Sequence, residues 1–450
     1  MKKTVCVLAV VLIGAAALFA TNARVESMGK SATFFMDDVS IFENPANINI
    51  YPNFLIGEPG RITEFSDSNT NYKNQDPAEP FGGGILAFSL NKDKNAETRY
   101  PMLTLGAIMN HQNELVDVLM GAARANVDAL HPDGHIIPKP VVPNSDFFIG
   151  YTLDNGVMLG GHFYATKQTI DVPFKDLNNS KQELIDAGIL TATDSSGMAY
   201  DSLMLLNASE KTGDMSWSSG VYRGDLGVNM PVSQNMDLEV SLGIAIMQYS
   251  GNKSVELGKY AIPDYNDQDL SIFASARLFS TLVSLNGELV PVVKYKHVAI
   301  RNYTKNEVIG GIGANVTLDR GFFWAGTEVN WSNTESPKQN GRLKDISALN
   351  IPLSFGIERN VVWDWLVLRV GFRKILWGSY SNQSDLTMLK TNPEADMTAS
   401  DHVGGGIGLN IEEKLKIDCV VAEDFLYKFG NLISGNSHHV FSRITATYSF

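Results

Sequence analysis

The sequence predicts an all-β protein, a transmembrane antiparallel β-barrel of about 14 strands (14–16) with an amino-terminal plug segment. Three observations predict it. The chain ends on a strand with one apolar and one polar face, similar segments recur between alternately short and long connections, and the chain begins with an export leader. After the leader, no uninterrupted apolar run approaches the roughly 20 residues that a membrane-spanning helix needs.

The carboxyl-terminal strand is the clearest of these features. From residue 438 onward, apolar side chains fall on one parity and polar ones on the other. Side chains alternate between the two faces of a strand, so one face suits lipid and the other suits water. The apolar set is Val440, Ile444, Ala446, Tyr448 and Phe450. We expect Ile444, Tyr448 and Phe450 to direct membrane insertion, with the barrel-assembly machinery and outer-membrane lipids as partners.

The amino-terminal leader defines the first segment of the chain. Lys2 and Lys3 precede an apolar run at residues 5–19, and small residues follow it. This pattern predicts a signal peptide cleaved after Ala20 or Ala23. We therefore expect a signal peptide at residues 1–23, a plug at 24–49 and the barrel at 50–450, in the outer membrane of a Gram-negative bacterium. The mature chain keeps only Cys419, which excludes an intrachain disulfide.

Composition limits the partners of the protein. The net charge is −13, and this excess of acidic residues argues against nucleic acid, whose phosphates need basic side chains. Six Trp, 15 Tyr and 22 Phe can supply aromatic girdles at both rims of a barrel.

Alternating segments recur along the whole chain. Short connections are expected at residues 154–156, 231–235, 281–282, 319–321, 360–362 and 412–414, and long ones at 170–215, 251–268 and 375–401. Short turns at one end and long loops at the other are typical of an outer-membrane barrel. The candidate strands are residues 50–58, 82–90, 102–110, 146–153, 157–169, 216–229, 236–250, 269–280, 283–297, 307–318, 322–332, 346–359, 363–374, 402–411, 415–424 and 438–450.

The charged residues of these strands share the parity opposite to the apolar side chains. A charge facing lipid at mid-depth costs about 2–4 kcal/mol, so these residues are expected to face the lumen. The predicted lumen-facing set is Arg277, Glu288, Lys294, Glu328, Arg369, Arg373, Asp418 and Arg443. A soluble β-sandwich would show the same alternation and stays open as an alternative, but it explains the aromatic terminus and the alternating connections poorly.

A short motif lies between the leader and the first strand. Asn44 can cap a helical turn that has Pro45 at its first position and Ala46 next. In this setting the segment resembles the amino-terminal plug of the FadL/PorV group of outer-membrane proteins. Near the other end, residues 353–358, 368–373 and 404–409 resemble the last strands of PorV-like members. The resemblance implies a barrel of 14 strands, in which case residues 50–58 could belong to the plug.

One amphipathic helix is predicted in the mature chain, at residues 114–130. Its apolar stripe contains Leu115, Val118, Leu119 and Ala122. The topology places this helix in an extracellular loop, where it could pack on its own barrel. The resemblance to FadL suggests instead that it forms a surface groove that captures a lipid-like ligand.

Glycine and proline mark special positions in the strands. We expect the glycines at residues 82–84 and 404–406 to permit kinks or a close approach of the plug. Pro291 and Pro352 cannot donate to a β-ladder, so each predicts a bulge, a strand end or a local opening. Near a rim such an opening would have no functional meaning, whereas at mid-depth it could mark a lateral gate, as the resemblance to this family implies.

The residues offer no convincing catalytic or metal site. Ser437, His438 and His439 form the one compact candidate, and they fit ordinary loop residues better. His131 and His135 are separated by Pro132 and Gly134, which argues against a helical metal site. We therefore expect no enzymatic activity and no cofactor.

Two functions follow from these expectations. The first is passive uptake of a hydrophobic or amphipathic small molecule, such as a fatty acid, captured by the helix and admitted past the plug. The second, implied by the resemblance to PorV-like members, is binding or anchoring of secreted proteins for a secretion system. A purely structural role of the long loops, as adhesive or shielding surfaces, is a third possibility.

Overall fold

The fold is seen in a computed structural model of the chain. It describes residues 22–59, 80–91, 101–111, 113–119, 143–173, 214–251, 265–300, 303–336, 344–361, 363–384, 402–412, 414–421 and 441–450. Residues 1–21 of the predicted signal peptide and most of the predicted long loops lie outside these residues, whereas Asn22 and Ala23 are described as the start of a short helix.

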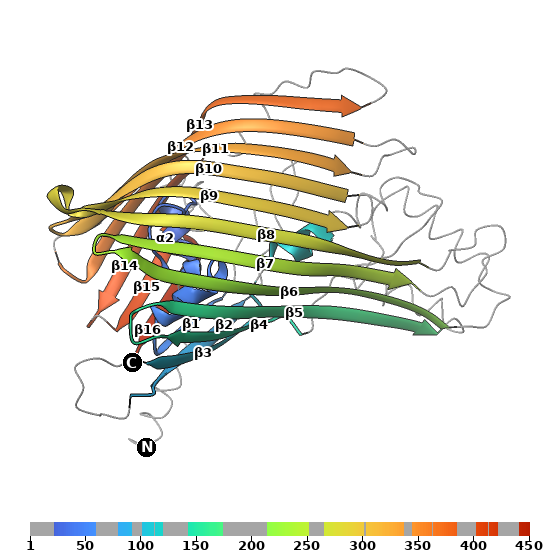
Figure 1. The fold of residues 1–450 in the computed structure, drawn as a ribbon, viewed down its shortest axis with the longest axis horizontal. Helices are drawn as coiled ribbons and strands as arrows, with labels where there is room; N and C mark the ends of the chain where they lie inside the picture. The colour runs from blue at the N-terminus through green and yellow to red at the C-terminus, as the bar shows by residue number, and fades with distance from the viewer. Residues whose placement is uncertain are drawn as a thin grey trace, which may run out of the picture.

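The strands form one closed antiparallel barrel in which each strand pairs with its neighbours in sequence (Figure 1). The strands are β1 (Phe54–Glu58), β2 (Phe81–Ser89), β3 (Met102–Met109), β4 (Ser145–Thr152), β5 (Met158–Pro173), β6 (Asp214–Ser233), β7 (Met236–Gly251), β8 (Tyr265–Leu282), β9 (Gly287–Ile300), β10 (Tyr303–Leu318), β11 (Gly321–Ser336), β12 (Lys344–Asn360), β13 (Leu366–Ser384), β14 (His402–Ile411), β15 (Leu415–Val421) and β16 (Phe441–Ser449).

The first and last strands close the ring. Phe54 of β1 pairs with Ser449 of β16 on one side and with Ile85 of β2 on the other. Each of the sixteen candidate segments corresponds to one strand. The count of 14 implied by the resemblance is therefore wrong, and so is the assignment of residues 50–58 to the plug, because β1 is part of the barrel wall.

The two ends of the barrel differ in their connections. Short turns join β4 to β5, β6 to β7, β8 to β9, β10 to β11, β12 to β13 and β14 to β15. We call this end, where the carboxyl terminus also lies, the turn end, and the opposite end the loop end (Figure 1). One predicted turn is misplaced. The chain passes residues 281–282 as strand and turns in the short helix η5 (Val283–Leu285), followed by Asn286 at φ 49°. Asparagine tolerates this left-handed conformation better than most residues.

The wall is much taller on one side than on the other (Figure 1). Strands β5 to β13 have 14 to 20 residues, whereas β1 to β4 and β14 to β16 have 5 to 10. About 9–11 tilted residues suffice to cross a bilayer, so the long strands extend beyond it at the loop end. The outward Asn266 and Gln268 of β8, near that end, are exposed polar side chains, which fits water rather than lipid there.

The two faces of the wall have opposite character. On β7, outward Leu242 and Ile244 are 60% and 57% exposed, while inward Glu239 is 2% exposed. Leu226, Ile149 and Val370 on other strands are exposed in the same way. An apolar exterior around a polar interior is the arrangement of a membrane-embedded barrel. Among the described residues, no helix is long and apolar enough to cross a membrane.

Both prolines interrupt a ladder, as predicted. The pairing of β8 with β9 skips from Arg277–Val292 to Ser280–Leu289, around Pro291. The pairing of β11 with β12 skips from Thr327–Leu353 to Asn330–Asn350, and β12 also has a bulge against β13 at Pro352. Proline lacks an amide hydrogen, which explains the lost pairs.

The lumen is occupied by the chain that precedes β1. This stretch, which we call the luminal segment, contains α2 (Asn22–Ser27), η1 (Asp38–Phe42) and η2 (Pro45–Asn49). Helix α2 packs against β13, β14 and β15, and η2 packs against β4, β5 and β6, on the far side of the ring. The segment therefore crosses the barrel (Figure 1).

Two apolar clusters anchor the luminal segment. Met28, Phe34 and Phe35 pack with Phe279 and Trp324 of the wall. Ile41 and Ile48 pack with Phe54, Ile85 and Phe148 on the other side. All these side chains are nearly inaccessible to solvent, so the core of this protein lies inside the barrel, between the wall and the segment.

Candidate functional site

The wall is shaped to receive the luminal segment. Inward-facing Gly160, Gly227 and Gly371 contact it so closely that a Cβ atom would lie 2.2 Å from the amide nitrogen of Ala46, 1.9 Å from Oδ1 of Asn44 and 2.1 Å from the amide nitrogen of Gly29, respectively. Only glycine permits so close an approach of the wall to the segment. The expectation for residues 404–406 is confirmed, since a Cβ on Gly404 would lie 2.6 Å from the carbonyl oxygen of Glu26. At Gly83 the close neighbour is the carbonyl oxygen of Ala107 on β3, 2.1 Å from the Cβ position, so glycine there allows two strands to approach.

The Asn44-Pro45-Ala46 motif begins η2, as its capping pattern predicts. Oδ1 of Asn44 accepts a hydrogen bond from the amide of Ala46 at 3.1 Å, and Pro45 occupies the first helical position. The amide of the same side chain donates to the carbonyl of Val228 on β6 at 3.3 Å. Asn49, at the end of η2, donates to the carbonyl of Leu159 on β5 at 3.0 Å. The motif therefore both starts a helix and ties it to the wall.

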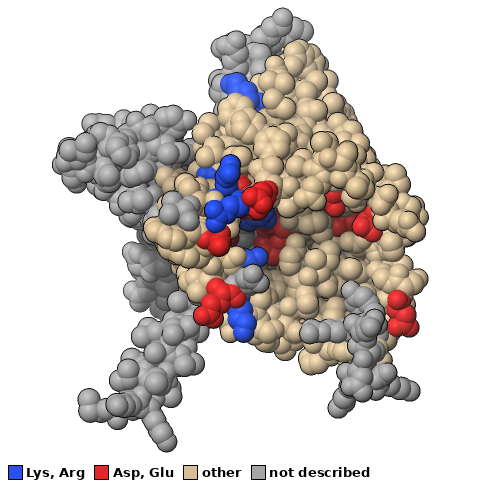
Figure 2. Space-filling view, turned by 90° about the vertical axis from the view of Figure 1, so that its left-hand side faces the viewer, with Lys and Arg blue, Asp and Glu red and all other residues tan. Residues whose placement is uncertain are grey.

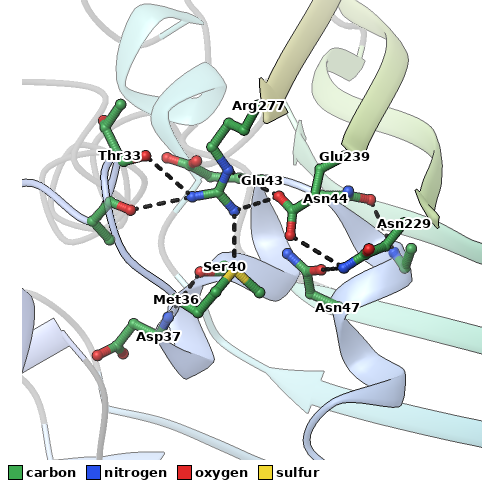
Figure 3. Close-up of polar contacts among 12 residues, drawn as sticks. Thr33, Met36, Asp37, Ser40, Glu43, Asn44, Asn47, Asn229, Glu239 and Arg277 are labelled. Carbon is green, nitrogen blue, oxygen red and sulfur yellow. Dashed lines mark hydrogen bonds and ion pairs between the residues drawn. The ribbon is translucent and has the colours of Figure 1, made fainter. Parts of the chain in front are cut away.

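A buried ion pair holds the middle of the segment. Arg277 of β8 binds Glu239 of β7 with Nη2–Oε2 at 2.7 Å, and both side chains are 3% exposed. The same guanidinium donates to the carbonyl oxygens of Ala32 and Thr33 at 3.2 and 3.4 Å (Figure 3). Asn315 of β10 donates to the carbonyl of Phe34 at 2.9 Å. Wall side chains thus satisfy backbone groups that the irregular segment cannot pair internally.

A second charged network ties the start of the segment to β12, β13 and β15. Arg24 of α2 binds both carboxylate oxygens of Glu358, at 2.9 and 2.7 Å, and also contacts Asp37. Arg369 bridges Glu358 at 2.9 Å and Asp418 at 2.6 Å. Burial disfavours the charge of Arg24, but Glu358 and Asp37 outweigh it and raise its pKa well above the usual value.

On its loop-end side, the luminal segment is joined to the wall through an acidic residue. Glu43 lies 3.0 Å from Nζ of Lys294 on β9. Burial would raise the pKa of Glu43, but Lys294 and Arg277 outweigh this and lower it from 4.5 to about 2. The Glu43 carboxylate therefore stays ionised at neutral pH, and its contact with Lys294 joins the segment to the tall side of the wall.

The structure places all eight residues of the predicted lumen-facing set on inward positions with polar partners. Besides the pairs above, Glu288 accepts from Asn315 at 3.0 Å, and Arg373 lies 3.3 Å from Glu328. Arg443 binds Glu26 of the segment at 3.0 Å and Glu58 of β1 at 2.9 Å. Ile444 and Phe450 of the predicted insertion strand are 41% and 56% exposed on the outside of the barrel.

The predicted capture helix is described only at residues 114–119. Its Leu115 and Leu119 are fully buried, Val118 is half-buried, and Glu114 forms an ion pair with the inward-facing Lys296. Ala122 lies outside the described residues. The apolar stripe is therefore packed against protein, and a ligand would reach Leu115 or Leu119 only if the covering groups were displaced.

A buried histidine network was missed by the sequence reading. His162 of β5 lies 2.8 Å from a carboxylate oxygen of Asp146 through Nε2 and 2.8 Å from one of Asp225 through Nδ1. Both ring nitrogens therefore face carboxyl oxygens, an arrangement that favours the charged form of the ring. The ring of Phe148 stacks on it at 4.5 Å. Parity along β4, β5 and β6 places these residues on one face, but the pairing register was needed to bring them together.

A cavity of about 450 Å³ opens at the turn end, between the luminal segment and the wall. Its lining comes from the segment (Arg24, Asp37, Asp38 and Tyr51) and from the wall on β12 to β16 (Arg369, Lys416 and Asp418 among others). Figure 2 shows acidic and basic side chains gathered around the hollow at this end. The sequence did not predict this cavity, because its lining residues come from distant parts of the chain.

Other chemical sites find no support in the described residues. There, no group of three or more His, Cys, Asp or Glu side chains could hold a metal ion. Ser437, His438, His439, His131 and His135 lie outside those residues.

No family model and no curated protein matches the chain. It is similar to solved barrels, however. The Pseudomonas putida toluene transporter TodX is 10% identical at a TM-score of 0.35, with 96% of each chain covered. The CymD monoaromatic hydrocarbon channel is 10% identical at 0.31, with 96% of this chain and 98% of that chain covered. CdiB from Acinetobacter baumannii is 11% identical at 0.35, with 88% and 59% covered.

These similarities are of barrel form. The resemblance of the sequence to the FadL group is likewise a resemblance to outer-membrane barrels; of these three structures, one is named a toluene transporter and one a monoaromatic hydrocarbon channel. At such TM-scores they carry no inference about the substrate, which has to be argued from the side chains of this chain.

Proposed function

We propose that the protein is an outer-membrane channel for passive uptake of hydrophobic or amphipathic small molecules, fatty acids among them. The apolar exterior supports a place in the membrane. The filled lumen supports a substrate that does not need a straight water-filled path, because ion pairs and hydrogen bonds hold the segment to several strands around the ring. The luminal segment would act as the plug.

The observation that carries the proposal is the interrupted pairing of β11 and β12 beside this filled lumen. Glu328 and Val329 of β11 have no ladder partner in β12, where Ile351 and Pro352 lie opposite them. On the outside, Val329, Trp331, Leu376 and Trp377 are 41% to 62% exposed. On the inside, Arg373 and Glu328 form an ion pair. A molecule with an apolar body could leave the lumen sideways here, because fewer backbone hydrogen bonds close the wall.

A disulfide staple tests this route. In a Cys419→Ser background, Val329→Cys and Ile351→Cys would link the two strands across the interruption. Cells with a lipopolysaccharide outer membrane that express the oxidised protein should take up a hydrophobic fluorophore more slowly, and reduction should restore the rate.

The matched control places the same staple at a paired position, with Ala325→Cys and Phe355→Cys, which are ladder partners. This staple should leave uptake unchanged. Equal uptake with and without the Val329–Ile351 staple would exclude this route, and uptake no faster than in cells lacking the barrel would exclude transport itself. Capture by the helix at residues 114–130 and binding of secreted proteins stay predictions.

A further inference from the structure

The turn-end cavity has an unusual balance of charge. Asp37 and Asp38 of the luminal segment line one side, and Asp418 of β15 lines the other. Arg24 and Arg369 also line the cavity, but each is already bound to carboxylates. Arg24 binds Glu358 and Asp37, and Arg369 binds Glu358 and Asp418.

Two of these carboxylates, those of Asp37 and Asp38, could accept further hydrogen bonds. Oδ1 of Asp37 has no hydrogen-bond partner among the described residues, and Asp37 is buried, at 3% exposed. Its carboxylate points away from the Arg277 cluster (Figure 3). Asp38 accepts a hydrogen bond from Thr447 at 3.4 Å, and within the described ranges no basic side chain pairs with it. A buried acceptor without a donor is costly, which indicates a missing partner.

The electrostatic surroundings of Asp38 point the same way. Burial, the neighbouring carboxylate of Asp37, a side-chain hydrogen bond with Asp37 and the carboxylate of Asp418 raise its pKa well above the usual value, against the weaker effect of Arg24. An added cation would relieve this repulsion. Lys416 at the edge of the cavity is the one basic lining residue without a described ion-pair partner, but it is exposed.

The kind of cation follows from the shape and the lining. The described residues contain no cluster arranged to hold a metal ion. A volume of about 450 Å³ lies in the range of small-molecule sites, which is roughly 300–1,000 Å³. The ring of Tyr51 also lines the cavity and packs edge-on against Phe54, with centroids 6.2 Å apart. Aromatic faces together with carboxylates attract organic ammonium groups.

We propose that the turn-end cavity binds a small organic amine, with its ammonium group between Asp37 and Asp38 and its apolar body against Tyr51. This site is separate from the route through the wall, and binding there does not depend on whether the barrel transports anything. The carboxylates supply charge-assisted hydrogen bonds, which are stronger than neutral ones.

Three probes of similar shape test the proposal by titration calorimetry on the purified full-length barrel in detergent. Phenethylamine carries an ammonium group, 2-phenylethanol carries a hydroxyl and phenylacetate carries a carboxylate. We expect phenethylamine to bind one site at least about tenfold more tightly than the alcohol, since a hydrogen bond to a charged group is stronger than one between neutral groups. Phenylacetate should not bind measurably. Equal affinity for the amine and the alcohol, or preference for phenylacetate, would overturn the proposal.

Two variants locate the site. Asp38→Asn keeps the shape of the side chain and removes its charge, so it should weaken phenethylamine binding about tenfold. Lys416→Gln removes a cation from the rim and should leave binding equal or tighter. Retained affinity in Asp38→Asn, or weaker binding in Lys416→Gln, would exclude this placement. The change in gel mobility on boiling verifies that each variant is folded, and competition by Mg²⁺ at equal concentration would indicate a metal site instead.

Discussion

Removal of the Arg277 guanidinium should weaken the attachment of the luminal segment to the wall and lower the free energy of unfolding of the barrel. Arg277→Met keeps much of the length and apolar volume of the side chain but leaves Glu239, which is 2% exposed, without its cation. Asn229 would remain near Glu239 at 3.4 Å, a weak substitute. The carbonyl oxygens of Ala32 and Thr33 would also lose their donor.

The size of the effect follows from these contacts. Breaking a buried ion pair by removing one partner costs about 3–5 kcal/mol, most of it from the charge left behind. In Arg277→Met/Glu239→Gln the stranded charge is gone, and what remains lost is the pair of hydrogen bonds to the segment, each about 0.5–1.5 kcal/mol. The double variant should therefore be more stable than Arg277→Met alone.

Equilibrium unfolding in urea, with the refolded barrel in detergent micelles and far-ultraviolet circular dichroism as the signal, measures these differences. A matched control is Arg320→Met, because Arg320 lies in an exposed turn and pairs there with Asp364. That change should lower the free energy of unfolding far less than Arg277→Met does, because water screens an exposed ion pair. The single variant Glu239→Gln completes the comparison. If the double variant is destabilised by the sum of the effects of Arg277→Met and Glu239→Gln, these two residues do not act as a buried pair, and the reasoning about the segment is refuted.

Three further changes probe the same packing. Deletion of residues 28–46 should raise the conductance of the barrel in planar bilayers, and unchanged conductance would contradict a plug at this position. Gly371→Ala should lower the urea midpoint strongly, because its Cβ would lie 2.1 Å from backbone atoms of the segment, whereas Gly310→Ala, with nothing within 4 Å, should leave it unchanged. Similar midpoints for these two variants would show that the close approach is not rigid. The pKa of Glu43 is lowered from 4.5 to about 2, so its pair with Lys294 stabilises the fold above about pH 4.5 and loses that contribution as the pH falls toward 2. Unfolding of the native chain and of Glu43→Gln from pH 2 to 7 should accordingly differ near neutrality and converge in acid, and a constant difference would contradict this assignment.

Much of the barrel could be predicted because its determinants are local. Alternation with period two places each strand and decides which side chains face lipid, since a charge facing hydrocarbon is too costly. Arg277 was assigned to the inner face and Ile444 to the outer face on this basis, and they are 3% and 41% exposed. The strand count derived from the residues was better than the count implied by the resemblance, because residues 50–58 were counted as a strand and β1 does pair on both sides.

The contents of the lumen were beyond such reasoning. Arg24 meets Glu358 across 334 positions of sequence, and His162 meets Asp225 across 63. No periodicity encodes these partners, because they depend on the registers of many strands and on the path of an irregular segment. The motif at Asn44 predicted its own helix cap but not its contact with Val228. The apolar stripe of the helix that begins at residue 114 predicted that these side chains are buried, but not which residues cover them.

By itself, the sequence determined the strands, their two faces, the ends at which the chain turns, and a segment before β1 that is not strand. Only the tertiary structure decided that this segment crosses the lumen, that β1 closes the ring, and that a charged cavity remains at the turn end. The physical reason is range: alternation acts between neighbouring residues, whereas ion pairs, close glycine contacts and cavities arise when the closed ring brings distant residues together.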